Sequence, residues 1–181
     1  YKKGSIVCAG SGITIGAHIA PIACRHIENA DNVFLQVTFD GNGIREMNSN
    51  LHSLQAFYAE DKVRRITYKK MVNAMTTEVT AEKVVGAFYG HPGIFALPPH
   101  NVIKIAKNTK KEEYNAHTVP GISAEDCFYA DMGVDPGKVG SQHFEAIQFM
   151  FYKRRVDPSA YLILRQVGIA VDVSAAKLSS G

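Results

Sequence analysis

Short apolar runs alternate with amphipathic segments along most of this 181-residue chain. The apolar runs predict strands over residues 5–9, 33–37 and 83–89. Apolar residues at helical spacing predict helices over residues 18–30 and 66–82, between those strands. This alternation of strands and helices predicts an α/β fold, with a mainly parallel sheet and helices on its faces.

The later part of the chain continues the same alternation. We expect further strands over residues 53–58, 114–119 and 160–167. A helix is expected over residues 98–105, because two prolines are tolerated in its first turn. Residues 135–137 read Asp-Pro-Gly and predict a turn.

Composition narrows the classes of function. The chain is 46% hydrophobic and 20% charged, which is typical of a soluble globular protein. Its net charge of +3 without a long basic block gives little support to nucleic-acid binding, and its apolar runs are too short to span a membrane. Three cysteines, an odd number without metal-ligand spacing, are expected to be reduced, to bind no metal and to suit the cytoplasm.

The most informative segment is KVVGAFYGHPGIF, residues 83–95, where an apolar strand runs into a tight loop. Two glycines and a proline allow a sharp turn and a close backbone approach to a ligand. Tyr89 and His91 lie on that turn, at the carboxyl end of the strand, where open α/β sheets build their sites. A ligand-binding loop and a stiff turn without chemistry fit these residues equally well.

A glycine cluster follows the first strand. Gly10, Gly12 and Gly16 resemble a dinucleotide fingerprint, but the last spacing is one residue too long. Gln36 and Val37 stand where the acidic residue of that fingerprint should be. The cluster therefore favours a tight strand-to-helix turn over a site for NAD or FAD.

Arg64 and Tyr68 lie four residues apart, so on a helix they share a face, and Tyr58 precedes them. A guanidinium beside a phenol lowers the pKa of the phenol and can hold a developing oxyanion. The alternative is a solvated helix start on which the tyrosine simply packs. The residues by themselves favour this alternative.

Two further positions could bind a ligand. Ser123 is placed to cap a helix with Glu125 and Asp126 in its first turn, after a strand end and a Pro-Gly turn. Such a helix start presents free N–H groups to a ligand, but it fits a merely well-capped helix equally. Gln166 ends a strand, and its amide could contact a ligand or satisfy a loop.

Three segments together resemble one known family. YGHPGIF, PGISAEDCFYADMGVDPG and QVG, in this order and spacing, are similar to the tetrapyrrole-methylase superfamily. The branch that they resemble most is that of the borosin peptide backbone α-N-methyltransferases. His91 stands where precorrin-type members usually carry aspartate, and together with RRITYKKM it points to the borosin branch.

The resemblance implies a site that binds S-adenosyl-L-methionine between two α/β domains. By this match the catalytic residues are Arg64, Tyr68, Tyr89 and Tyr58, and the cofactor-binding residues are Tyr89, His91, Ile94, Ser123 and Gln166. Residues 1–120 would form the N-terminal α/β methylase domain. Residues 121–181 would form a linker and the first, incomplete part of a second α/β domain.

The resemblance also implies an activity and partners. We expect methylation of backbone amide nitrogens of a separate precursor peptide, because the sequence shows no substrate extension, and we expect a homodimer. Two alternatives stay open at this point. One is a binding or scaffold protein that keeps the fold without catalysis, and the other is a methylase of tetrapyrroles or other small molecules.

Overall fold

The predicted alternation of strands and helices is present in the computed structural model, which describes residues 4–14, 16–36, 42–58, 64–77, 82–108 and 115–168. The chain divides into two units, Tyr1–Cys127 and Phe128–Gly181. The domain boundary expected at residue 120 stays a prediction.

The first unit is built on a five-stranded sheet. Its strands lie in the order β3-β2-β4-β1-β5, and each neighbouring pair is parallel. They span β1 (Ser5–Gly10), β2 (Asn32–Gln36), β3 (Leu51–Ser53), β4 (Lys83–Phe88) and β5 (Asn115–Val119). The apolar runs of β1 and β4 lie in the centre of the sheet and are buried on both faces, as parallel strands require.

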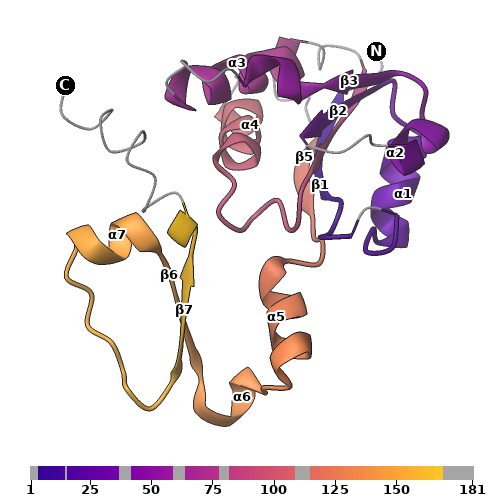
Figure 1. Ribbon diagram of the computed structural model, residues 1–181. Coiled ribbons are helices and arrows are strands. Elements are labelled where there is room, and N and C mark those ends of the chain that lie inside the picture. The colour runs from indigo at the N-terminus through magenta and orange to yellow at the C-terminus, as the bar shows by residue number, and fades with distance from the viewer. Residues whose placement is uncertain are drawn as a thin grey trace. The chain divides into compact units, whose positions relative to one another are not determined.

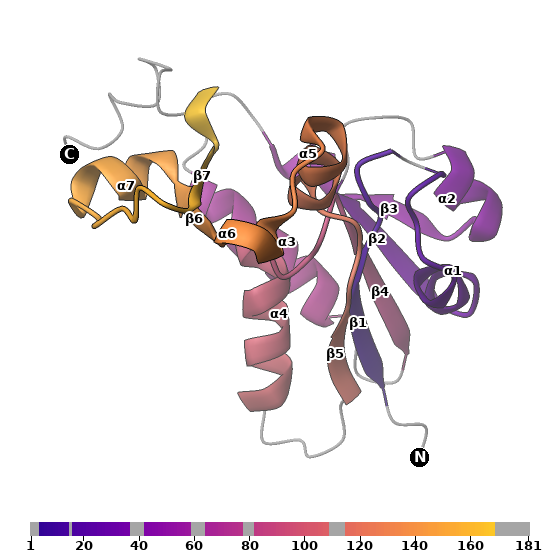
Figure 2. The same cartoon turned by 90° about the horizontal axis from the view of Figure 1, so that it is seen from below.

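Helices cover both faces of this sheet. Helices α1 (Pro21–Glu28) and α2 (Asn42–Met47) pack on one face, while α3 (Arg64–Thr77) and α4 (Leu97–Asn108) pack on the other (Figure 1). Figure 2 shows the sheet edge-on between the two layers. The apolar face expected on the helix over residues 66–82 is confirmed for Met71, Val72 and Met75 of α3, which are buried. Val79, at the far end of the expected face, lies outside the described residues.

The order of strands creates a switch point between β1 and β4. From β1 the chain passes through α1 to β2 on one side of the sheet, and from β4 it passes through α4 to β5 on the other. The two connections also leave toward opposite faces. Ligands of open α/β sheets bind outside the carboxyl ends of the strands at such a point.

Two predicted elements of the first unit are wrong in detail. The first helix begins at Pro21 and not at residue 18, since a residue before proline is disfavoured in helical conformation and Ala20 is extended. The strand expected over residues 53–58 is β3, which ends at Ser53, followed by the 3-10 helix η1 (Leu54–Phe57). The hydroxyl of Ser53 accepts a hydrogen bond from the N–H of Gln55 and so starts this helical turn.

Helix α5 (Ala124–Met132) begins in the first unit and continues into the second. The second unit also holds α6 (Pro136–Val139), β6 (Ser141–Glu145), α7 (Ala146–Phe151) and β7 (Tyr161–Arg165), with β6 and β7 parallel. The expected turn at 135–137 is the start of α6, where the carboxylate of Asp135 accepts a hydrogen bond from the N–H of Gly137. The expected strand at 160–167 is shorter, because Gln166 has a positive φ of 58° and ends it.

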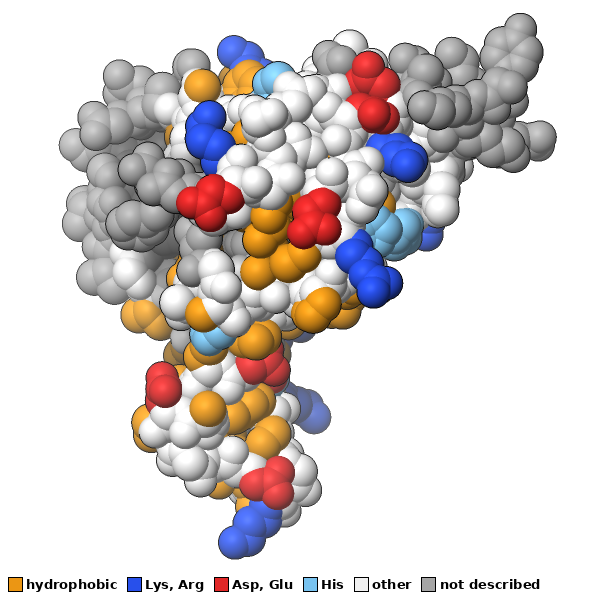
Figure 3. Space-filling model, turned by 90° about the vertical axis from the view of Figure 1, so that its right-hand side faces the viewer, with side chains coloured by type: hydrophobic (Ala, Val, Ile, Leu, Met, Phe, Trp, Pro, Cys, Tyr) orange, Lys and Arg blue, Asp and Glu red, His pale blue; other side chains and the backbone are white. Residues whose placement is uncertain are grey.

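The three cysteines are free, and burial raises the pKa of the Cys8 thiol to about 12, which keeps that thiol protonated. No helix among the described residues is long and apolar enough to cross a membrane. On the face that carries α1 and α2, basic and acidic side chains are interspersed with small groups of apolar ones (Figure 3).

Candidate functional site

Three strand ends meet at glycines beside the switch point. Gly10 ends β1, while Gly90 and Gly121 follow β4 and β5. A Cβ atom on Gly10 would lie 2.5 Å from the carbonyl oxygen of Gly90 and 2.6 Å from the Cα of Gly121. The three backbones therefore touch directly, which only glycine permits. Gly12 and Gly90 exchange two backbone hydrogen bonds, of 3.3 and 2.9 Å.

Ser11 joins the end of β1 to the end of β4. Its N–H and its hydroxyl both donate to the carbonyl of Phe88, at 2.8 and 3.0 Å, and its side chain is buried. Sequence reasoning did not identify this contact, because it depends on β1 and β4 being neighbours. The glycine cluster is thus a strand-to-strand joint, in agreement with the tight turn that its spacing favours.

The loop after β4 carries an exposed Tyr89 and a half-buried His91. The N–H of Gly93 donates to Nδ1 of His91 at 2.9 Å, and Nε2 of His100 donates to the carbonyl of Gly93 at 3.0 Å. The N–H of Ile94 also donates to the carbonyl of His91, at 3.1 Å. These contacts hold the His-Pro-Gly turn in one conformation at the carboxyl end of β4.

Ser123 and Asp126 form a capping box at the start of α5. The N–H of Ser123 donates to the Asp126 carboxylate at 2.6 Å, and the Ser123 hydroxyl donates to the same oxygen at 2.8 Å. The hydroxyl accepts in turn from the N–H groups of Glu125 and Asp126. It therefore already uses its one donor and two acceptor positions within the chain. The bond from the Ser123 N–H is also the main reason that the pKa of Asp126 is lowered.

Tyr58 lies at the same edge of the sheet. Its hydroxyl accepts a 2.7 Å hydrogen bond from the Gln36 amide, at the end of β2. Gln36 pairs in register with Phe88, the residue before Tyr89, so this hydrogen bond holds the Tyr58 hydroxyl at the end of the strand beside β4. Tyr58 and Tyr89 are 40% and 53% exposed, which leaves both aromatic rings accessible to a ligand.

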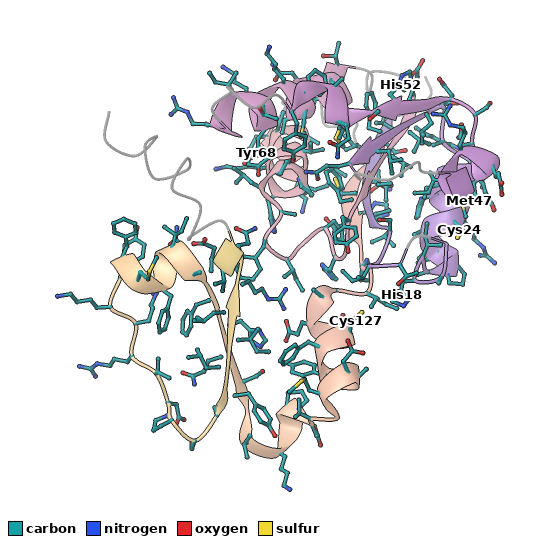
Figure 4. The ribbon with its side chains drawn as sticks, in the orientation of Figure 1. His18, Cys24, Met47, His52, Tyr68 and Cys127 are labelled. Carbon is teal, nitrogen blue, oxygen red and sulfur yellow. The ribbon has the colours of Figure 1, made fainter. Side chains whose placement is uncertain are left out.

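The second predicted pair lies on α3. Tyr68 is half-buried and packs against the apolar cluster between this helix and the sheet, where α3 passes α4 (Figure 4). Next to it, Thr67 donates to the carbonyl of Phe57, the residue before Tyr58. The start of α3 is thereby tied to the segment that carries Tyr58. The side chain of Arg64 lies outside the described residues.

The structure thus brings together most of the predicted residues of the first unit. Tyr89, His91 and Ile94 share the loop after β4. Ser123 follows β5, which is separated from β4 by β1. Tyr58 follows η1 and reaches the end of β2 through its bond with Gln36. Gln166 belongs to the second unit, at the end of β7. Among the described residues, no group of three His, Cys, Asp or Glu side chains could hold a metal ion.

A parallel α/β sheet with an aromatic, histidine-bearing loop at its switch point is typical of α/β proteins that bind ligands. The chain belongs to the tetrapyrrole (corrin/porphyrin) methylases, whose family pattern it matches over residues 5–168.

Solved structures share this fold. A cobalamin synthesis related protein from Corynebacterium diphtheriae has a TM-score of 0.64 at 12% identity, with 88% of this chain and 71% of that chain covered. The uroporphyrin-III-C-methyltransferase from Thermus thermophilus has a TM-score of 0.59 at 15% identity, with 89% and 67% covered.

Curated relatives are much more similar in sequence. A methyltransferase/ribosomally synthesized type I borosin cyclic peptide precursor from Coprinopsis marcescibilis is 45% identical over 93% of this chain and 43% of its own length. The methyltransferase/omphalotin A precursor from Omphalotus olearius is 39% identical over 92% of this chain and 40% of its own length. The chain therefore spans less than half the length of these two relatives.

Proposed function

We propose that this protein is an S-adenosyl-L-methionine-dependent methyltransferase that methylates backbone amide nitrogens of a peptide. The observation that supports the proposal is the placement of Tyr58, Tyr89 and His91 at the carboxyl edge of one parallel sheet, next to its switch point, in a chain of the tetrapyrrole-methylase family. The similarity to borosin precursors that include a methyltransferase supports a peptide as the substrate, rather than a tetrapyrrole.

The residues at this edge fit the chemical groups of S-adenosyl-L-methionine. This cofactor has a cationic sulfonium, a polar amino-acid end and a nucleoside, and it supplies an electrophilic methyl group when bound. The exposed ring of Tyr89 offers a π-face to a cation. His91 and the main chain of the loop offer hydrogen-bonding groups, and Ile94 offers apolar surface. The hydroxyl of Ser123 is already satisfied, so we propose that Ser123 acts by fixing the start of α5 beside the cofactor.

The proposed reaction has one main difficulty. An amide nitrogen is a poor nucleophile, because its lone pair is delocalised into the carbonyl. The protein must align this nitrogen with the methyl group and stabilise the amide oxygen as the proton leaves. Alignment can supply several kcal/mol of the barrier, and an oxyanion donor roughly 3–4 kcal/mol. We propose that Arg64 and Tyr68 stabilise the amide oxygen, and that Tyr58 and Tyr89 position the peptide.

Three finer points belong to the same proposal and rest on the resemblance. Gln166 would contribute to the cofactor site from the second unit. The protein would act as a homodimer in the cytoplasm. Its substrate would be a precursor peptide.

The cofactor and the substrate can be tested separately. Isothermal titration with S-adenosyl-L-methionine and S-adenosylhomocysteine should give a heat of binding, and the melting temperature should rise, since a ligand that binds only the folded state stabilises it by mass action.

The substrate is tested with synthetic peptides copied from the precursor segments of the two relatives, and mass spectrometry detects the added methyl groups. Cofactor binding without methylation of any peptide would favour the binding-protein alternative. Methylation of a tetrapyrrole instead would favour the small-molecule alternative.

A further inference from the structure

The loop after β4 fixes not only the position of His91 but also its tautomer. Nδ1 of His91 accepts the N–H of Gly93 at 2.9 Å, so in the neutral ring this nitrogen cannot carry the proton. The ring lies against Gly93 so closely that a Cβ on that glycine would be 3.0 Å from Cε1 of His91 and 3.1 Å from its Nδ1. The proton of the neutral ring must therefore be on Nε2, which is directed away from this contact.

A second histidine keeps Gly93 in the orientation that this bond requires. The carbonyl of Gly93 can only accept, so His100 donates to it from Nε2. Gly93 thus has its N–H on one imidazole and its carbonyl on another. Among the described residues, nothing forms a hydrogen bond with Nε2 of His91. This N–H is the polar group that the loop leaves for a ligand.

The surroundings of His91 indicate what kind of acceptor fits. His91 is close enough to Asp126 to make a small contribution to the lowered pKa of that carboxyl, after the larger contribution of the Ser123 N–H. An ionised carboxylate near His91 would repel a second carboxylate. A neutral acceptor fits this position better than the carboxylate of an amino acid does.

We propose that the neutral ring of His91 is held as the Nε2–H tautomer and donates a hydrogen bond to a neutral acceptor in the nucleoside part of the cofactor. This inference rests on the proposed function for its ligand, but its assignment of the tautomer does not. It also defines the role of the glycine after Pro92. Gly93 provides the N–H that selects the tautomer and lacks the Cβ that would press on the ring.

The tautomer is tested on the protein without ligand. Long-range nitrogen–proton NMR correlation distinguishes the two neutral forms of an imidazole, and the spectrum of His91→Asn identifies the signals of His91. We expect a protonated Nε2 and an unprotonated Nδ1. A protonated Nδ1 in the neutral ring, or a mixture of the two forms, would overturn the proposal whatever the cofactor does.

The ligand is tested with two probes that share their nucleoside. S-adenosylhomocysteine has the amino-acid end, and 5′-methylthioadenosine lacks it. His91→Asn keeps an acceptor for the N–H of Gly93 but removes the outer N–H, so the loop should survive the change. We expect this variant to bind both probes about 3–10-fold more weakly, as for one neutral hydrogen bond.

His100→Ala is the control for a looser loop, since it removes the other contact of Gly93. His100→Ala should weaken the binding of both probes less than His91→Asn does. If His91→Asn weakened the binding of S-adenosylhomocysteine alone, His91 would lie at the amino-acid end of the cofactor, which would overturn the ligand assignment. If the unmodified protein bound neither probe, the proposed function would fail together with that assignment, and the tautomer would still be decided by NMR.

Discussion

Replacing Gly121 by alanine should damage both the stability and the site, because this glycine is packed against two other strand ends. The new Cβ would lie 2.4 Å from the carbonyl oxygen of Gly90, 2.7 Å from the Cα of Gly10 and 2.9 Å from its carbonyl carbon. All three neighbours are backbone atoms, so no change of rotamer relieves the contact. The strand ends must separate by about 1 Å to reach an ordinary contact distance.

The expected cost follows from this geometry. Overpacking in a core costs typically 1–3 kcal/mol, and a contact that only backbone movement can relieve belongs at the upper end or beyond. We therefore expect Gly121→Ala to lower the free energy of unfolding by about 3 kcal/mol, or the melting temperature by roughly 6–12 °C for a chain of this size. Movement of Gly90 would also disturb its hydrogen bonds with Gly12 and weaken cofactor binding.

Urea unfolding followed by far-UV circular dichroism measures this cost, since the chain has no tryptophan to report it. Gly43→Ala is the matched control: nothing in the described part of the chain lies within 4 Å of its future Cβ, and its backbone is helical. That change should leave the free energy of unfolding unaltered or raise it by up to ~1 kcal/mol. Equal stability of the two variants, within about 1 kcal/mol, would refute the reasoning.

Other changes test other parts of the account. Asp126→Asn should lower the free energy of unfolding by about 1 kcal/mol, because it weakens the capping box. The folded pKa of Asp126 lies below its ordinary value, so the unmodified chain has this stability above about pH 4 and loses it as the pH falls through the folded pKa. Urea titrations at several pH values measure the difference. Burial, and to a smaller extent the nearby His117, lower the pKa of His26. The free energy of unfolding should therefore be highest above about pH 6.5 and decline below it, because protonation then favours the unfolded chain. His26→Gln should flatten this part of the plot of stability against pH. Arg64→Lys and Tyr68→Phe should each slow methylation at least ~100-fold with little change in cofactor affinity, and a Tyr68→Phe variant that methylates at the unmodified rate would return Tyr68 to a packing role.

Elements whose burial appears as an apolar run could be predicted from the sequence. β1, β4 and the buried face of α3 follow from composition and periodicity, and the cap at Ser123 follows from local hydrogen-bonding chemistry. β6 could not be predicted, because Ser-Gln-His-Phe-Glu has neither an apolar run nor a clear alternation. α2 is short and carries a glycine, so it too gave no helical signal.

The candidate site was predictable as a set of residues but not as an arrangement. The motif after β4 identified Tyr89 and His91, yet the bond from Gln36 to Tyr58 depends on β2 lying beside β3. The joint between Ser11 and Phe88 likewise requires the order of strands. Strand order follows from packing across the whole sheet, which periodicity along one segment does not contain.

The most direct test of the central claim uses S-adenosyl-L-methionine with an isotopically labelled methyl group. The protein is incubated with a synthetic peptide from the precursor segment of the Coprinopsis marcescibilis relative, and tandem mass spectrometry locates the label. The account predicts labelled methyl groups on backbone nitrogens, at a rate that falls at least ~100-fold in Tyr68→Phe. Label on side chains alone, or no label on the peptide from a protein that binds the cofactor, would contradict it.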